Sequence, residues 1–177
     1  MAGSKIARRG YLGLGALALL GGSSLVRRAL RLHLRQPPLV GTRVAPMTLQ
    51  IVANGSGSFA LPPQRVLVAD FFESSCGPCS VALPKTQYRV KDNDVDFVAI
   101  SIDEERSDAA KVAGDWGIVK PIVWDVNGAA KQAFQIVGIP NLVVISPTGR
   151  ITGWFPYDPP EDLLADAIQD ARDDSGS

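Results

Sequence analysis

The residues best suited to chemistry in this chain are two cysteines three positions apart, Cys76 and Cys79, in the stretch SSCGPCSVALP. The sequence has no third cysteine, and its single histidine, His33, lies near the N-terminus. A structural zinc site needs four ligands, so the pair does not predict one. Thiol–disulfide exchange, a static disulfide and a two-thiolate site for a soft ion such as Cu(I) remain as alternatives.

The position of the pair favours redox exchange. The two cysteines follow an apolar run at residues 65–72 and open a helix that the sequence predicts over Cys79–Lys91. A sulfur at the start of a helix lies over unpaired backbone N–H groups and the positive end of the helix dipole, which favours thiolate over thiol. We therefore expect Cys76 to attack a client disulfide and Cys79 to resolve the mixed disulfide.

Short apolar runs alternate with helical stretches around the cysteines. The runs have the composition of strands, and two are nearly continuous, as in strands covered on both faces. Four strands are predicted, at residues 65–72, 95–103, 141–146 and 150–155. Helices are predicted at 79–91, 107–114 and 127–134, with a final helix that begins near residue 159. This order predicts an α/β domain, a central mixed sheet with helices on both faces.

The stretch VADFFESSCGPC resembles the active-site strand and turn of thioredoxins. The resemblance implies that Asp70 is a buried acid that accepts the proton of Cys79, and that Pro84 bends the active-site helix. Ala99 stands where thioredoxins carry a lysine near this acid. Without that charge, desolvation should raise the pKa of Asp70. The alternative is a strand acid bound only to backbone or water.

A second stretch, VGIPNLVVISPTGRI, resembles the thioredoxin segment that contains a cis proline. The resemblance implies a cis bond between Ile139 and Pro140, with Gly138 as a structural neighbour of the site. It also implies that the backbone of Ile139 pairs with an extended client peptide. The residues expected to contact the client are Gly77, Pro78, Ile139 and Pro140. The Gly-Pro pair between the cysteines is the thioredoxin choice, which implies a reductant.

Two further stretches resemble anchored extracytoplasmic thioredoxins of the TlpA/ResA type: VGTRVAPMTL, and the extra strand and helix expected within residues 98–140. This resemblance covers about residues 40–172. It implies a monomeric protein-disulfide reductase without a bound cofactor, with exported thiol proteins such as apocytochrome c as clients and an integral-membrane thiol carrier as electron donor. Ser75 replaces the tryptophan that usually precedes the first cysteine, which implies a more open client surface.

Residues 1–36 differ in composition from the predicted thioredoxin-like domain at 37–174. The first 35 residues hold seven of the 18 Lys and Arg residues and none of the 18 acids. Together with the uncharged run at Gly10–Val26, this predicts a bacterial export signal or uncleaved membrane anchor, with the domain on the periplasmic, extracytoplasmic face of the inner membrane. A mitochondrial presequence and a soluble tail are the alternatives. The acidic domain argues against nucleic-acid binding, and residues 175–177 read as a disordered tail.

Other functions would use the same residues. The dithiol could bind peptides or Cu(I) without turnover, or act as a thiol peroxidase, although the peroxiredoxin motif Pro-x-x-x-Thr/Ser-x-x-Cys is absent. The acidic stretch DEER at residues 103–106 is interpreted as a solvated strand end, with no metal site. The large aromatic residues are interpreted as packing residues, namely Trp116, Trp124, Phe134 and Trp154.

Overall fold

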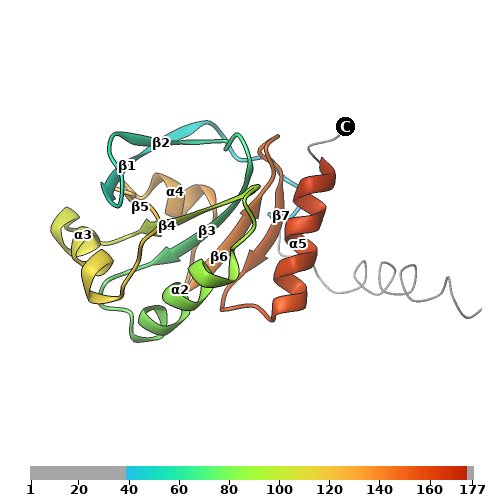
Figure 1. Ribbon diagram of the computed structural model, residues 1–177. Coiled ribbons are helices and arrows are strands. Elements are labelled where there is room, and N and C mark those ends of the chain that lie inside the picture. Colours follow the sequence, from blue (N-terminus) through green and yellow to red (C-terminus); the bar gives the residue numbers. More distant parts are fainter. Residues whose placement is uncertain (1–38, 175–177) are drawn as a thin grey trace, which may run out of the picture. The chain divides into compact units, whose positions relative to one another are not determined.

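The computed structural model describes residues 39–174, shown in colour in Figure 1. The predicted leader at residues 1–36 and the predicted tail at 175–177 lie outside the described residues. Among the helices of the described part, none is long and apolar enough to cross a membrane. The labels below are those of Figure 1.

The described chain forms a seven-stranded mixed sheet in the order β2-β1-β5-β4-β3-β6-β7. Strands β3, β4 and β5 are parallel, and antiparallel pairs extend the sheet on both sides. The strands are β1 (Met47–Ala53), β2 (Ser58–Leu61), β3 (Val66–Phe72), β4 (Val95–Ser101), β5 (Ile122–Trp124), β6 (Asn141–Ile145) and β7 (Ile151–Phe155). All residues of β3 are buried, as expected for a central strand covered on both faces.

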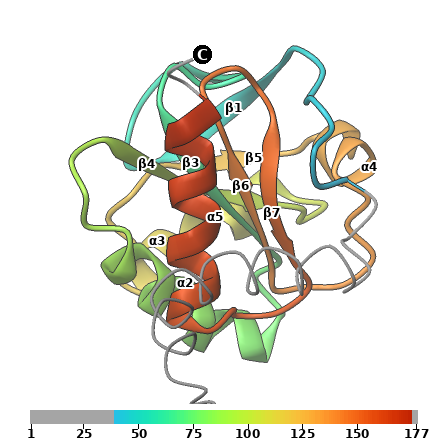
Figure 2. The same cartoon turned by 90° about the vertical axis from the view of Figure 1, so that its right-hand side faces the viewer.

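Helices cover both faces of this sheet, as Figure 2 shows. They are α2 (Gly77–Arg89), α3 (Arg106–Asp115), α4 (Ala129–Ala133) and α5 (Glu161–Asp173). One core lies between the sheet and α2, α3 and α5, and includes Leu83, Val112 and Leu164. The other core lies on the α4 side, where Phe134 packs against Phe71 with ring centroids 5.5 Å apart. The predicted fold class is therefore confirmed.

The hairpin of β1 and β2 was not predicted from the sequence. The first of the four predicted strands begins at residue 65, so both strands of this hairpin were missed. The strands pair antiparallel through a turn at residues 54–57, in which Asn54 has φ 56° and Gly57 has φ 82°. The extra strand and helix expected between residues 98 and 140 are β5 and α4.

Candidate active site

The two cysteines lie at the start of α2. Cys76 is the N-cap residue, and its Sγ accepts a hydrogen bond from the backbone N–H of Cys79 at 3.1 Å. The two residues form a disulfide with their Cα atoms 5.2 Å apart. Cys76 is half-buried, whereas Cys79 is fully buried. A client could therefore reach Cys76 first, with Cys79 enclosed behind it.

Helix α2 holds the pair with one irregularity. Gly77 and Pro78 occupy its first turn and are exposed beside the disulfide. Pro84 lies inside the helix, as expected from the sequence. Since proline has no N–H, it cannot donate the usual helical bond at that position, and such residues bend helices.

Asp70 lies on β3 and is only 2% exposed. Its neighbours across the sheet are Ala99 on β4 and Leu142 on β6, and neither brings a charge. Val68 and Phe72, which alternate with Asp70 on the same face of β3, pack in the core that contains Cys79. The Asp70 side chain therefore faces the helix that carries the dithiol.

Burial raises the pKa of Asp70 from 3.8 to about 8. The nearby Thr86 hydroxyl partly opposes this effect, and the negative charge of Asp158 adds to it. The Oδ1 atom of Asp70 accepts no hydrogen bond from a residue that the structure describes. The raised pKa agrees with the direction expected from the sequence.

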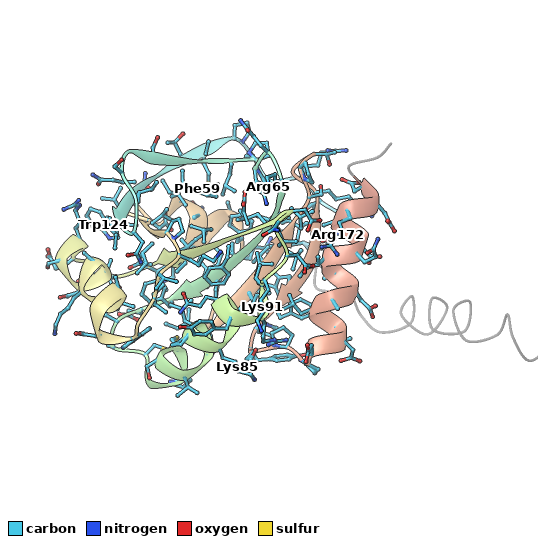
Figure 3. The ribbon with its side chains drawn as sticks, viewed as in Figure 1. Phe59, Arg65, Lys85, Lys91, Trp124 and Arg172 are labelled. Carbon is cyan, nitrogen blue, oxygen red and sulfur yellow. A yellow bond between two sulfur atoms is a disulfide. The ribbon has the colours of Figure 1, made fainter. Side chains whose placement is uncertain are left out.

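Asp158 links α2 to the segment before α5. Its carboxylate contacts Lys85 Nζ at 2.6 Å and Arg89 Nη1 at 2.5 Å, and Arg89 Nη2 also donates to the Pro159 carbonyl at 2.9 Å. Lys85 is labelled on α2 in Figure 3. These contacts fix the far half of α2 against the segment that follows β7.

The bond between Ile139 and Pro140 is cis, as expected. Both residues are half-buried, and they lie directly before β6, which pairs with β3. Asn141 lies opposite Phe71 in this antiparallel pair, so Ile139 and Pro140 lie at the edge of the sheet where β3 ends and the dithiol turn begins. Ile139 also packs against the core that Cys76 contacts. The two segments expected to form the site thus meet at one edge.

One residue near the site was misjudged from the sequence. Asp103 was interpreted as part of a solvated strand end, but it is only 6% exposed. Its Oδ1 accepts hydrogen bonds from the backbone N–H of Ser74 at 2.9 Å and from the Ser74 hydroxyl at 2.6 Å. Its Oδ2 accepts one from the Ser101 hydroxyl at 2.7 Å, and its carbonyl accepts one from the Trp124 indole at 2.8 Å. The solvated interpretation holds only for residues 104–106, which are exposed.

Asp103 could have been identified from the polar residues that follow the ends of two neighbouring parallel strands. Phe72 at the end of β3 lies opposite Ser101 at the end of β4. Ser74 and Asp103 each follow two residues later, so they leave the sheet at the same edge. When a polar residue follows each of two neighbouring parallel strands at the same distance, the two side chains leave the sheet at the same edge and can form a hydrogen bond there.

A small groove of about 130 Å³ borders this edge. Its lining comes from the loop before Cys76 and from α3 with the residue that follows it: Ser74, Asp108, Lys111, Val112, Asp115 and Trp116. Trp116 packs edge-on against Phe72 with ring centroids 5.7 Å apart, in agreement with its interpretation as a packing residue.

Known proteins share this architecture. The family model described as Redoxin matches residues 40–169. Thiol-disulfide oxidoreductase ResA of Oceanobacillus iheyensis is 26% identical over 88 residues, which cover 48% of this chain and 46% of that protein. The chain therefore aligns with less than half of the length of this relative. Thioredoxin-like protein SkfH of Bacillus subtilis is 28% identical over 111 residues, which cover 60% of this chain and 79% of that protein.

Solved structures agree in fold. StoA of Bacillus subtilis superposes with a TM-score of 0.60 at 18% identity, covering 73% of this chain and 98% of StoA. The Redoxin match spans most of the chain, and the matched residues include both the dithiol at the start of α2 and the cis proline. The chain therefore belongs to the Redoxin family, and within it the chain is similar to thiol-disulfide oxidoreductases of the ResA type.

Proposed function

We propose that the protein is a protein-disulfide oxidoreductase that reduces disulfides in client proteins. The observation that carries this proposal is the arrangement of the two sulfurs, with a half-buried Cys76 capping α2 and a fully buried Cys79 behind it. A static structural disulfide needs no accessible sulfur at a helix start. An exchange reaction needs one sulfur that a client can reach and one that it cannot.

The reaction begins with the reduced dithiol. The Cys76 thiolate attacks one sulfur of the client disulfide, forms a mixed disulfide and releases the other client sulfur as a thiolate, which takes up a proton. Cys79 then loses its proton to the Asp70 carboxylate and attacks the Cys76 sulfur. The mixed disulfide breaks, the second client sulfur leaves as a thiolate that takes up a proton, and the protein is left in the oxidised form described above. Two electrons from a thiol donor restore the dithiol.

Asp70 is suited to the proton transfer. A general base works best when its pKa lies near the working pH, and burial brings the pKa of this carboxyl to about 8. Its side chain faces the helix that carries Cys79, and the carboxyl has an oxygen to which no described residue donates.

The client would lie along the edge formed by four residues around the disulfide: Gly77, Pro78, Ile139 and Pro140. An extended peptide can pair with the backbone of Ile139 while its disulfide faces Cys76. Val137, two residues before Ile139, is 92% exposed and offers an apolar contact. Ser75 is exposed directly before Cys76, so a small side chain borders the disulfide there.

The cellular setting follows from the sequence of residues 1–36. We propose that this segment anchors the domain at 37–174 on the extracytoplasmic face of a bacterial inner membrane. An integral-membrane thiol carrier would supply electrons, and exported thiol proteins, including apocytochrome c, would be clients. We expect the domain to act as a monomer, without a bound cofactor and without nucleic acid.

An insulin-reduction assay with dithiothreitol as donor tests the activity. The wild-type protein should accelerate insulin precipitation, Cys76→Ser should abolish that activity, and Cys79→Ser should accumulate a mixed disulfide that reducing agent releases. Negligible turnover with stoichiometric Cu(I) binding would instead support a carrier. Rapid consumption of peroxide coupled to Cys76 oxidation would support a peroxidase.

A further inference from the structure

The segment Glu73–Ser75 joins two well-packed elements, β3 and the start of α2. On one side β3 is buried throughout, and on the other Cys76 caps α2 with its sulfur over the helix start. Within the segment, the backbone N–H of Cys76 donates to the Glu73 carbonyl at 2.9 Å, which forms a tight turn. The placement of Cys76 therefore depends on how this short segment is held.

Asp103 holds the middle of this segment. Its Oδ1 accepts both the backbone N–H and the hydroxyl of Ser74, so both polar donors of that residue bind one oxygen. The other oxygen is occupied by the Ser101 hydroxyl, and the Asp103 backbone N–H donates back to the Ser101 oxygen at 3.1 Å. The Trp124 indole binds the Asp103 carbonyl. Asp103 is thus fixed to β4 through one carboxylate oxygen and to β5 through its backbone carbonyl, and it presents the other carboxylate oxygen to the loop.

We propose that Asp103 is a positioning residue for the attacking thiol: by fixing Ser74 it holds Cys76 over the N–H groups that begin α2. This inference rests on the proposed function only in taking Cys76 as the attacking sulfur. Asp103 does not contact the client or the reacting atoms, and it acts through the position of the loop.

Removing the carboxylate has two separable effects on Cys76. Loss of a nearby negative charge stabilises the thiolate and moves the pH midpoint of its reaction down. Loss of the Ser74 anchor lets the sulfur leave the helix start, which destabilises the thiolate and moves the midpoint up. Asp103→Asn removes the charge but keeps an oxygen for Ser74 and an amide that can donate to Ser101. Asp103→Ala removes both the charge and the anchor.

The experiment measures the rate of iodoacetamide alkylation of Cys76 against pH in the reduced full-length protein, in a Cys79→Ser background. Because Asp103→Ala loses the hydrogen bonds to Ser74, we expect it to move the alkylation midpoint up and to lower the alkylation rate at pH 7 about tenfold. A tenfold change corresponds to a shift of one pH unit in the midpoint. Asp103→Asn should remain at or slightly below the parent midpoint. Ser74→Ala, which loses the hydroxyl but keeps the N–H bond, should lie between the Ala and Asn variants.

Asp125→Ala is the matched control. Asp125 is also a buried aspartate, 4% exposed, whose carboxylate accepts two backbone N–H groups, from Ala130 at 3.0 Å and Lys131 at 2.7 Å. Its bonds hold α4 and not the dithiol loop, so this variant should lose stability with an unchanged alkylation midpoint. Charged residues on the surrounding elements stay the same in every variant, including Asp70, Glu73, Glu104, Arg106, Asp108 and Lys111.

Three results would overturn the positioning role. The first is an alkylation midpoint that moves down in Asp103→Ala, which would assign the effect to the lost charge alone. The second is an unchanged midpoint in that variant. The third is an equal upward shift in Asp125→Ala, which would show that the midpoint responds to general loss of stability. If Asp103→Ala cannot be purified folded, the midpoints of Ser74→Ala and Asp103→Asn are compared. A midpoint of Ser74→Ala above that of Asp103→Asn supports the positioning role, and one equal to it or below it overturns that role. Alkylation requires no client, so failure of the proposed activity in the insulin assay remains a separate result.

Discussion

Replacing Asp70 by asparagine should remove a large pH dependence from the stability of this protein. The folded chain holds the Asp70 proton up to a pKa of about 8, whereas the unfolded chain releases it near 3.8. Between these values the native state binds one proton more than the unfolded state, so its stability falls as pH rises. Asparagine has no proton to lose, and it fits the same space.

The magnitude follows from the width of the window. Each pH unit in which the native state holds one extra proton is equivalent to about 1.4 kcal/mol, so the wild type should lose about 2 to 3 kcal/mol between pH 5 and pH 7. For a chain of this size, that loss is about 5 to 10 °C in Tm. Asp94 and Asp174 have lowered pKa values, so their contributions are lost only as pH falls below their usual range, outside this window.

The assay is urea unfolding of the oxidised protein at pH 5, 6 and 7, because disulfide-bonded cysteines do not titrate. The wild-type unfolding free energy should fall with pH, while that of Asp70→Asn should stay nearly flat. Asp125→Asn is the control, since its carboxylate is buried but bound by two backbone N–H groups, and it should keep the wild-type slope. Equal slopes in the wild type and Asp70→Asn would refute the argument. Under the proposed mechanism, Asp70→Asn should also slow resolution of the mixed disulfide about 100-fold.

Three further variants test the packing, the client surface and the charges near the site. Gly153→Ala should cost about 1–3 kcal/mol in urea unfolding, because the added Cβ would lie 2.8 Å from the Cβ of Ala167 on α5. Ser75→Trp should lower the KM for a peptide disulfide about fivefold, because a new aromatic contact contributes about 1 kcal/mol, with stability unchanged at this exposed position. Asp158→Asn should lower the pKa of Asp70 and move the end of the pH-dependent stability loss to lower pH, since Asp158 raises that pKa.

Each of these variants has a clear contradicting result. Gly114→Ala on α3, where an added Cβ meets nothing within 4 Å, is the packing control and should not destabilise the protein. A similar loss in both glycine variants would contradict the close contact between β7 and α5. An unchanged KM in Ser75→Trp would show that clients do not contact this position. If the unfolding free energy of Asp158→Asn depends on pH as that of the wild type does, the effect of the Asp158 charge on the pKa of Asp70 is contradicted.

The sequence predicted the centre of the fold better than its edge. The strands at β3 and β4 are apolar runs because both of their faces are covered, so composition alone identifies them. The hairpin of β1 and β2 has one fully buried residue in each strand, Leu49 and Leu61, so its pattern has little hydrophobic periodicity. Its one local signal is the Asn54-Gly55 pair in the turn, which is typical of hairpins.

The candidate site was predictable where residue types carry the chemistry. The two cysteines at this spacing and the proline after Ile139 can be recognised from the sequence alone. The structure places the dithiol and this proline at one edge of the sheet. Asp103 was missed because the three residues after it are charged, and the run 103–106 is typical of a solvent-exposed turn. Its burial comes from Ser74, which is 29 positions away, and only the pairing of β3 with β4 brings the two together.

The two buried aspartates near the dithiol differ in how their oxygens are satisfied, and this difference suits different tasks. Both oxygens of Asp103 accept hydrogen bonds, so any change in that carboxyl must break contacts that hold the loop. Asp70 has an oxygen to which no described residue donates and a pKa near 8, so it can gain or lose a proton with little rearrangement. A thiol exchange site needs both properties: a fixed path for the chain that carries the nucleophile, and a carboxyl that can gain and lose a proton while facing the helix that carries the resolving sulfur.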